Sequence, residues 1–185
     1  MHLPGSDAAP SAHAVQGRVA RLGSAIHVEG LNHWYRSGRA SVQALHRISL
    51  DVPAGGYVAL TGPSGAGKST LLSLIGGLER PQQGGLRVGE HNLTGLRGDA
   101  LAAYRRGTVG FVFQHFGLLD LLSARENIEL AAALASPAPD HRRLADLLER
   151  IHSERGCTLV VVTHNEAVAE RAERRHRLDD GRLLS

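Results

Sequence analysis

A glycine-rich run, TGPSGAGKST at residues 61–70, is the feature that most constrains how this chain folds. It follows a nearly unbroken apolar stretch, YVALT at 57–61, and it leads into an apolar stripe with helical spacing, STLLSLI. The run matches the phosphate-binding pattern G-x-x-x-x-G-K-[ST], which connects a strand to a helix. Glycines there let successive backbone N–H groups turn toward an anion, because side chains would block its approach. The run therefore predicts a phosphate-binding loop.

Each part of this loop has an expected role in holding a nucleotide. Lys68 brings a full positive charge toward the terminal phosphates, and the Ser69 hydroxyl is expected to ligate a Mg²⁺ ion that bridges two of them. The start of the following helix adds partial positive charge. The expected binding residues are Gly62, Pro63, Ser64, Gly65, Ala66, Gly67, Lys68, Ser69 and Thr70. The alternative is a surface Gly/Ser turn, which would need neither the lysine nor the flanking strand and helix.

Strand-like and helix-like segments alternate along the rest of the chain. Ile26 and Val28 alternate with polar residues, as do Ile48, Leu50 and Val52, which predicts two half-buried strands joined by a loop containing HWYRSGR. After the phosphate loop we expect a helix stopped by Pro81, a strand at 86–88, a helix at 95–106, a strand at 109–114, a helix at 118–135, a helix from 141 to Gly156, a buried strand at 158–162, and a closing helix with a short strand. This alternation predicts an α/β architecture with a largely parallel sheet.

Length and composition fit one folded domain. The chain has 185 residues, of which 42% are hydrophobic and 21% charged. Its first 24 residues mix Pro, Ser, Asp and Gly, so we expect a disordered arm at 1–24 and the domain at 25–185. No run approaches the roughly 18 to 20 apolar residues that a membrane span requires. The net charge of +3 suits an anionic partner without identifying one.

Four stretches together carry a family resemblance: TGPSGAGKSTLLSLIGGLERPQQG, GFVFQHFGLL, TLVVVTHN and the terminal RLDDGRL. They resemble the ATP-binding subunits of ABC transporters, most closely the lipoprotein-releasing and macrolide-export branch, over residues 26 to about 134 and about 141 to 184. The resemblance implies a P-loop NTPase (ABC-type) core, with a mostly parallel sheet flanked by helices, an N-terminal antiparallel β part and a truncated helical subdomain.

The same resemblance implies the ligands and partners. It implies binding of ATP and Mg²⁺ and attachment to an integral membrane permease on the inner, cytoplasmic face of the cell membrane. It also implies pairing as a homodimer, or as a heterodimer with a complete ATP-binding subunit, and no nucleic-acid partner. Phe116, Leu118 and Leu119 would lie where the subunit meets its permease, although an apolar lining of its own domain explains them nearly as well.

Three further residues match functional positions of the family. Gln114 corresponds to the glutamine that joins the metal and the attacking water to the membrane partner, so the resemblance makes it a metal-binding and catalytic residue. His164 is similar to the switch histidine that reaches the terminal phosphate. Tyr35 stands where the family stacks an aromatic ring on adenine, a contact worth about 1 to 3 kcal/mol. The alternatives are a capped strand end for Gln114, a structural role for His164, and an ordinary core or surface aromatic for Tyr35 or its neighbour Trp34.

One part of the family pattern is absent from this chain. Where the family places the tip of its helical subdomain, the serine-glycine-glycine signature, and a strand ending in the metal-binding aspartate and catalytic glutamate, this chain has SPAPD at 136–140. Asp120 and Asp146 are the nearest acids, but the family's acid near the first has no metal role, and the second follows arginines rather than strand residues. We therefore expect hydrolysis to be impaired, and this chain cannot complete a partner's site.

The missing strand also has a consequence for folding. It would lie between the strands that lead to Gln114 and to His164. Removing it leaves two rows of backbone groups without partners unless those strands pair with each other. We expect either direct pairing of residues 109–113 with 158–162 or a partly open sheet.

These observations support two functions from different classes. The first is an internally shortened ATP-binding subunit of a transporter, which binds Mg-ATP to drive or regulate transport. The second is a non-hydrolysing, nucleotide-responsive module that binds and regulates a permease or an ATPase partner. A small nucleotide or metabolite kinase is a third option, but only Arg105 and Arg106 suggest the arginine-rich lid that such an enzyme needs.

Overall fold

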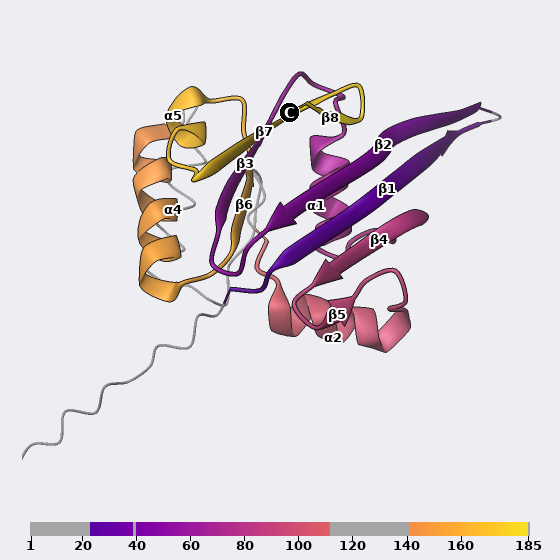
Figure 1. The fold of residues 1–185 in the computed structure, drawn as a ribbon, viewed down its shortest axis with the longest axis horizontal. Helices are drawn as coiled ribbons and strands as arrows, with labels where there is room; N and C mark the ends of the chain where they lie inside the picture. Colours follow the sequence, from indigo (N-terminus) through magenta and orange to yellow (C-terminus); the bar gives the residue numbers. More distant parts are fainter. Residues whose placement is uncertain (1–22, 39, 112–140, 185) are drawn as a thin grey trace, which may run out of the picture.

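The computed structural model describes residues 23–38, 40–111 and 141–184, which form two four-stranded sheets (Figure 1). The antiparallel sheet has the strand order β2-β1-β4-β5, and the mostly parallel sheet has the order β6-β3-β7-β8. Helices α4 and α5 lie on one side of the parallel sheet, while α1 and the antiparallel sheet lie on the other (Figure 1). This layered α/β fold confirms the predicted fold class.

The antiparallel sheet is built on a long hairpin. Strand β1 (Ile26–Ser37) pairs with β2 (Ala40–Val52), and its other edge pairs with β4 (Gln83–Val88), which in turn pairs with the short β5 (His91–Asn92). The expected loop through HWYRSGR is wrong, because β1 continues through most of it to Ser37. Register shifts along β1 interrupt its alternation, and such bulges admit polar residues that a regular strand pattern would assign to a loop.

The parallel sheet carries the glycine-rich loop. Strand β3 (Tyr57–Thr61) matches the expected bounds, and its first four residues are buried. It lies between β6 (Leu159–Val162) and β7 (Arg174–Asp179), both parallel to it, and β8 (Arg182–Leu184) returns antiparallel to β7. Because the three parallel strands end at one edge of the sheet, the loops that follow β3 and β6 emerge on the same side.

The helices on the two faces of the parallel sheet pack against different hydrophobic clusters. Helix α1 (Lys68–Ile75) buries Leu71 and Leu74 in a cluster that also contains residues of both sheets and of α2 (Gly98–Thr108). On the opposite face of the parallel sheet, α4 (His141–Arg155) and α5 (Glu166–Ala169) pack through a smaller cluster. Strand β6 contributes to both: Val160 and Val162 face the α1 side, and Leu159 and Val161 face α4.

Several expected boundaries are wrong. Helix α1 ends at Ile75 rather than near Pro81, because Gly77 adopts a φ of 69° and turns the chain, and Leu78 is 46% exposed. The expected closing helix is only the single turn α5, after which the chain forms two strands instead of one.

Two expectations about the strands near the missing segment need correction. The expected buried strand at 158–162 is only half-buried, since β6 pairs with β3 alone among the described residues. Residues 109–111 form no strand, although a strand was expected from residue 109. The remainder of that strand, the helix at 118–135, the SPAPD break and all but the last two residues of the expected arm lie outside the described residues. In the described part of the chain, no helix is both long enough and apolar enough to span a membrane.

Candidate nucleotide-binding site

The glycine-rich loop connects the carboxyl end of β3 to the start of α1, and two of its glycines are required by packing. Gly62 has a φ of 131°, and a Cβ there would lie 2.0 Å from the carbonyl oxygen of Leu178. Gly67 has a φ of 93°, and its Cβ would lie 2.5 Å from the carbonyl oxygen of Ala44. Side chains other than hydrogen are excluded at both places. The loop is therefore held tightly between β7 and β2.

Lys68 folds back across the loop. Its Nζ donates hydrogen bonds to the carbonyl oxygens of Gly62 at 2.8 Å and of Pro63 at 2.6 Å. The side chain thereby keeps its ammonium group beside the loop backbone instead of extending into solvent. At the start of α1, Gly67 supplies no side-chain cap and the first turn contains no acidic residue. The first N–H groups of this helix are consequently available to an anion.

The rest of the loop has an exposed rim and a buried base. Pro63, Ser64 and Gly65 are exposed, whereas Ala66 is buried. Ser69, at the beginning of α1, is also exposed. Its hydroxyl oxygen is a hard donor of the type that Mg²⁺ prefers. In the described part of the chain, no group of three or more His, Cys, Asp or Glu residues could hold a metal ion.

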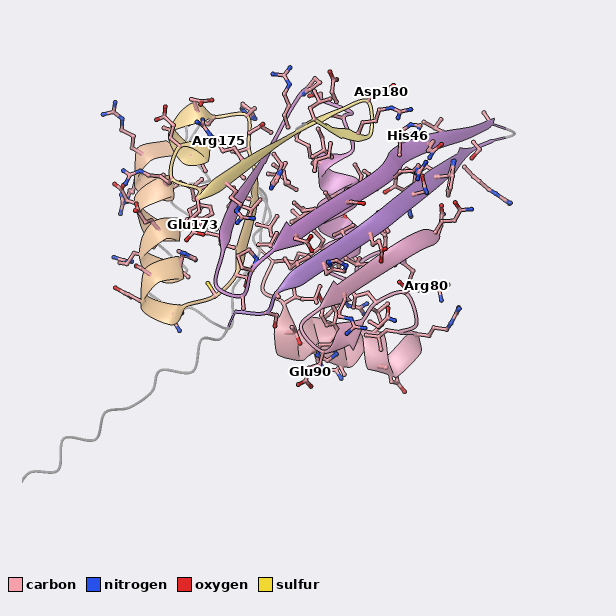
Figure 2. All side chains as sticks on the ribbon, in the orientation of Figure 1. His46, Arg80, Glu90, Glu173, Arg175 and Asp180 are labelled. Atoms are coloured by element: carbon pink, nitrogen blue, oxygen red, sulfur yellow. The ribbon has the colours of Figure 1, made fainter. Side chains whose placement is uncertain are left out.

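A turn near the end of the chain fixes the base of the loop. The backbone N–H of Gly181 donates to the carbonyl oxygen of Ala66 at 3.2 Å, and the carbonyl oxygen of Gly181 accepts from the N–H of His46 at 2.7 Å. Figure 2 shows His46 on β2 and Asp180 in the β7–β8 turn at the same end of the molecule. Sequence reasoning gave Gly181 no role, although the glycine in RLDDGRL was the available indication.

Tyr35 lies beside the start of helix α1, which follows the glycine-rich loop. Its hydroxyl is 2.7 Å from Oε1 of Glu79 and 3.4 Å from Oγ1 of Thr70. Burial raises the pKa of this phenol above its ordinary value, yet 40% of the residue remains exposed. The structure thus brings Tyr35 to the loop from a distant part of the sequence. Its neighbour Trp34 instead contacts Gln82 through its backbone.

His164 is placed at the same edge of the parallel sheet. Leu60 of β3 is the parallel register partner of Val162 of β6, so the chain leaves both strands on the side where the loop begins. The His164 side chain is exposed, and the next residue, Asn165, caps α5 by accepting from the N–H of Ala167 at 2.9 Å.

The remaining residues considered in the sequence analysis either lie outside the described residues or lie away from the glycine-rich loop. Gln114, the apolar residues 116, 118 and 119, and Asp120 lie outside the described residues. Asp146 is on the exposed face of α4, where its Oδ1 is 2.7 Å from an amino group of Arg171. It is therefore a solvated helix residue with an arginine partner.

Residues 45–179 match the protein family described as ABC transporter. The macrolide export ATP-binding/permease protein MacB of Hyphomonas neptunium is 31% identical over 220 residues, covering 86% of this chain and 34% of that protein. MacB of Nitrobacter winogradskyi is 44% identical over 128 residues, covering 68% of this chain and 20% of that protein. The chain thus spans about a third or less of the length of these relatives.

The fold of this chain is similar to that of a solved ATP-binding cassette over almost the whole length of the solved chain. The dimeric, post-hydrolysis structure of the ATP-binding cassette MJ0796 bound to ADP and Pi superposes with a TM-score of 0.70 and 26% identity. The match covers 86% of this chain and 97% of that one. The architecture around the glycine-rich loop is therefore similar to that of a cassette whose nucleotide-bound form is known.

Proposed function

The chain belongs to the ABC transporter family, and on that premise we propose that it binds Mg-ATP at residues 62–70 as the ATP-binding subunit of a membrane permease. The observation that carries this proposal is the geometry of the loop. Gly62 and Gly67 leave no room for side chains, Lys68 is held across the loop backbone, and the first turn of α1 has free N–H groups. These three features together provide both the shape and the charge that a triphosphate requires.

Each residue has a distinct role in this proposal. Loop N–H groups surround the terminal phosphates, Lys68 neutralises part of their charge, and Tyr35 stacks on adenine. Ser69 and Gln114 are the proposed protein ligands of Mg²⁺, which when bound lowers the charge of the phosphates that it bridges. His164 is the proposed contact to the terminal phosphate from the end of β6.

Binding is expected to persist where hydrolysis is impaired. Asp146, one of the two acids considered as replacements, is engaged by Arg171 on an exposed helix face. The comparison with the Hyphomonas protein runs over 220 residues although it covers only 86% of this 185-residue chain, which supports the loss of an internal segment. Losing the group that activates water typically costs about 10²- to 10⁴-fold in rate.

Calorimetry with Mg-ATP tests the binding proposal. We expect micromolar affinity, about −8 kcal/mol, and at least about a tenfold loss in Lys68→Ala, which removes a charged donor. Arg87→Ala, which removes an exposed charge from β4, is the matched control and should retain the wild-type affinity. The absence of heat with the wild-type protein would refute nucleotide binding.

Lysine labelling gives an independent measurement. Lys68 is the only lysine in the chain, so an amine-reactive reagent labels only this side chain and the α-amino group. Mg-ATP should protect Lys68 from labelling while the terminal amine remains reactive. Equal labelling with and without nucleotide would place ATP elsewhere.

Phosphate release separates the two functions. The shortened transporter subunit and the non-hydrolysing regulatory module both bind ATP, and the missing acids are the reason to keep the module as a second candidate. Stoichiometric binding without phosphate release, both alone and with a permease, would support the module. Robust turnover that Lys68→Ala abolishes would instead show that hydrolysis survives the loss of the segment.

A further inference from the structure

A hollow with a volume of about 500 Å³ lies where β1 meets the segment that follows α1. We call it the arginine pocket, because Arg36, Arg80 and Arg97 line it together with the aromatic rings of Trp34 and Tyr35. All three arginines are exposed, and Figure 2 shows Arg80 beside β4 at the outer side of the antiparallel sheet. The pocket thus combines planar apolar surfaces with three guanidinium groups.

The charge of this pocket is not neutralised from within. In the part of the chain that the structure describes, none of the three guanidinium groups is paired with a carboxylate. The one acid in the lining, Glu79, is already engaged: its Oε1 accepts from the Tyr35 hydroxyl at 2.7 Å, and its Oε2 is 3.0 Å from Nε2 of His33. The arginine donors therefore remain available to an anion from outside.

The walls of the pocket are held in place before any ligand arrives. The Gln82 side chain binds both backbone groups of Trp34, accepting from its N–H at 2.7 Å and donating to its carbonyl oxygen at 3.0 Å. His33 is only 4% exposed and packs edge-on against the Tyr35 ring, with the ring centres 5.0 Å apart. Its Nδ1 is buried, and the described residues offer it no hydrogen-bond partner. A fixed pocket loses little conformational freedom when it binds.

We propose that the arginine pocket docks an acidic peptide segment of a partner protein. The guanidinium groups would pair with carboxylates of the segment, and an apolar side chain between them would lie against Trp34. Tryptophan, tyrosine and arginine are the residue types most enriched at the energetic centres of protein interfaces. Because the pocket carries the positive charges of three arginines, charge complementarity favours an acidic rather than a basic partner.

The single tryptophan of the chain makes this proposal directly measurable. Trp34 is the only tryptophan of the chain and lines the arginine pocket, so its fluorescence can report on a ligand that binds there. Titration of the full chain with a decaglutamate peptide should change this fluorescence to saturation, whereas a decaglutamine peptide should not. Raising the salt concentration should weaken binding, because the contacts are exposed.

Arginine variants separate the pocket from general charge attraction. Arg36→Gln, Arg80→Gln and Arg97→Gln should each weaken decaglutamate binding about fivefold, and the triple variant on the order of a hundredfold. The matched control is a triple Gln variant at three exposed arginines of β7 and β8, namely Arg174, Arg177 and Arg182. This control has the same net charge and should bind within twofold of wild type.

Three outcomes would overturn the proposal: no fluorescence change with decaglutamate, equal losses in the two triple variants, or a stronger arginine-dependent response to inorganic triphosphate than to the peptide. The last outcome would make this a phosphate site. The test does not depend on the nucleotide proposal, because Lys68→Ala should bind decaglutamate as tightly as the wild-type chain does.

Discussion

Replacing Gly181 by alanine tests whether the β7–β8 turn holds the glycine-rich loop in place. Gly181 has a φ of 68°, and its added Cβ would lie 2.6 Å from the carbonyl oxygen of Ala44 and 2.7 Å from Cδ2 of His46. The imidazole of His46 can rotate, but the carbonyl oxygen of Ala44 cannot move freely, because it is backbone of β2. The substitution must therefore shift the turn or the strand.

The magnitude follows from two contributions. A residue with a Cβ in the left-handed region costs roughly 1 to 2 kcal/mol. Forcing a methyl group into packed backbone costs roughly 1 to 3 kcal/mol more. We therefore expect Gly181→Ala to lower the free energy of unfolding by about 3 kcal/mol. Gly30→Ala is the matched control, since Gly30 has a φ of 55° and nothing lies within 4 Å of its added Cβ. It should lose only about 1 kcal/mol.

Two assays separate the effect of this substitution on the stability of the protein from its effect on nucleotide binding by the glycine-rich loop. Urea unfolding, followed by Trp34 fluorescence, should give the ordering Gly181→Ala, Gly30→Ala, wild type from least to most stable. Calorimetry of the folded variants should show about a fivefold weaker Mg-ATP affinity for Gly181→Ala alone, because Ala66 loses its hydrogen-bond donor. Equal stability of the two variants would refute the steric argument. Unchanged ATP affinity in Gly181→Ala would refute the coupling to the loop.

Two further predictions concern the parallel sheet. The amide of Leu159 donates to Gly56, just before β3, and that of Thr163 donates to Leu60 of β3. In a parallel ladder the amides of Val160 and Val162 therefore point to the other edge of β6, where the described residues offer no partner. Hydrogen exchange followed by NMR should be at least about tenfold faster for Val160 and Val162 than for Leu159 and Thr163, and equal protection would show that a strand covers the edge. Burial, aided by the charge of a neighbouring arginine, lowers the pKa of His176 below 6.5. Unfolding lets this group bind a proton, so the wild type should lose stability relative to His176→Gln as the pH falls below 6.5, and the difference should level off beneath the lowered native pKa; parallel urea midpoints across this range would contradict that account.

Strand β6 illustrates where sequence patterns stop being informative. Its apolar run predicted a buried strand, and the structure has a strand at that place, but only a half-buried one. How deeply a strand is buried depends on which other strands and helices pack beside it in the fold. The two strands of the β1–β2 hairpin were predicted, but the extension of β1 through most of HWYRSGR was not, since bulges break the alternation by which strands are recognised.

The position of the glycine-rich loop between a strand and a helix could be predicted from the sequence. The glycines, Lys68 and Ser69 are contiguous, and the strand and helix on either side follow from local apolar spacing. Backbone freedom and helix polarity act over a few residues, so they need no knowledge of the remaining fold.

Tertiary structure alone decided what surrounds that loop. The hydrogen bonds of Gly181 to the loop and to β2, the position of Tyr35 beside Thr70, and the three arginines around Trp34 all join segments that are distant in sequence. Such contacts depend on strand order, register and bulges, and a one-residue change of register would turn each side chain to the opposite face of its sheet.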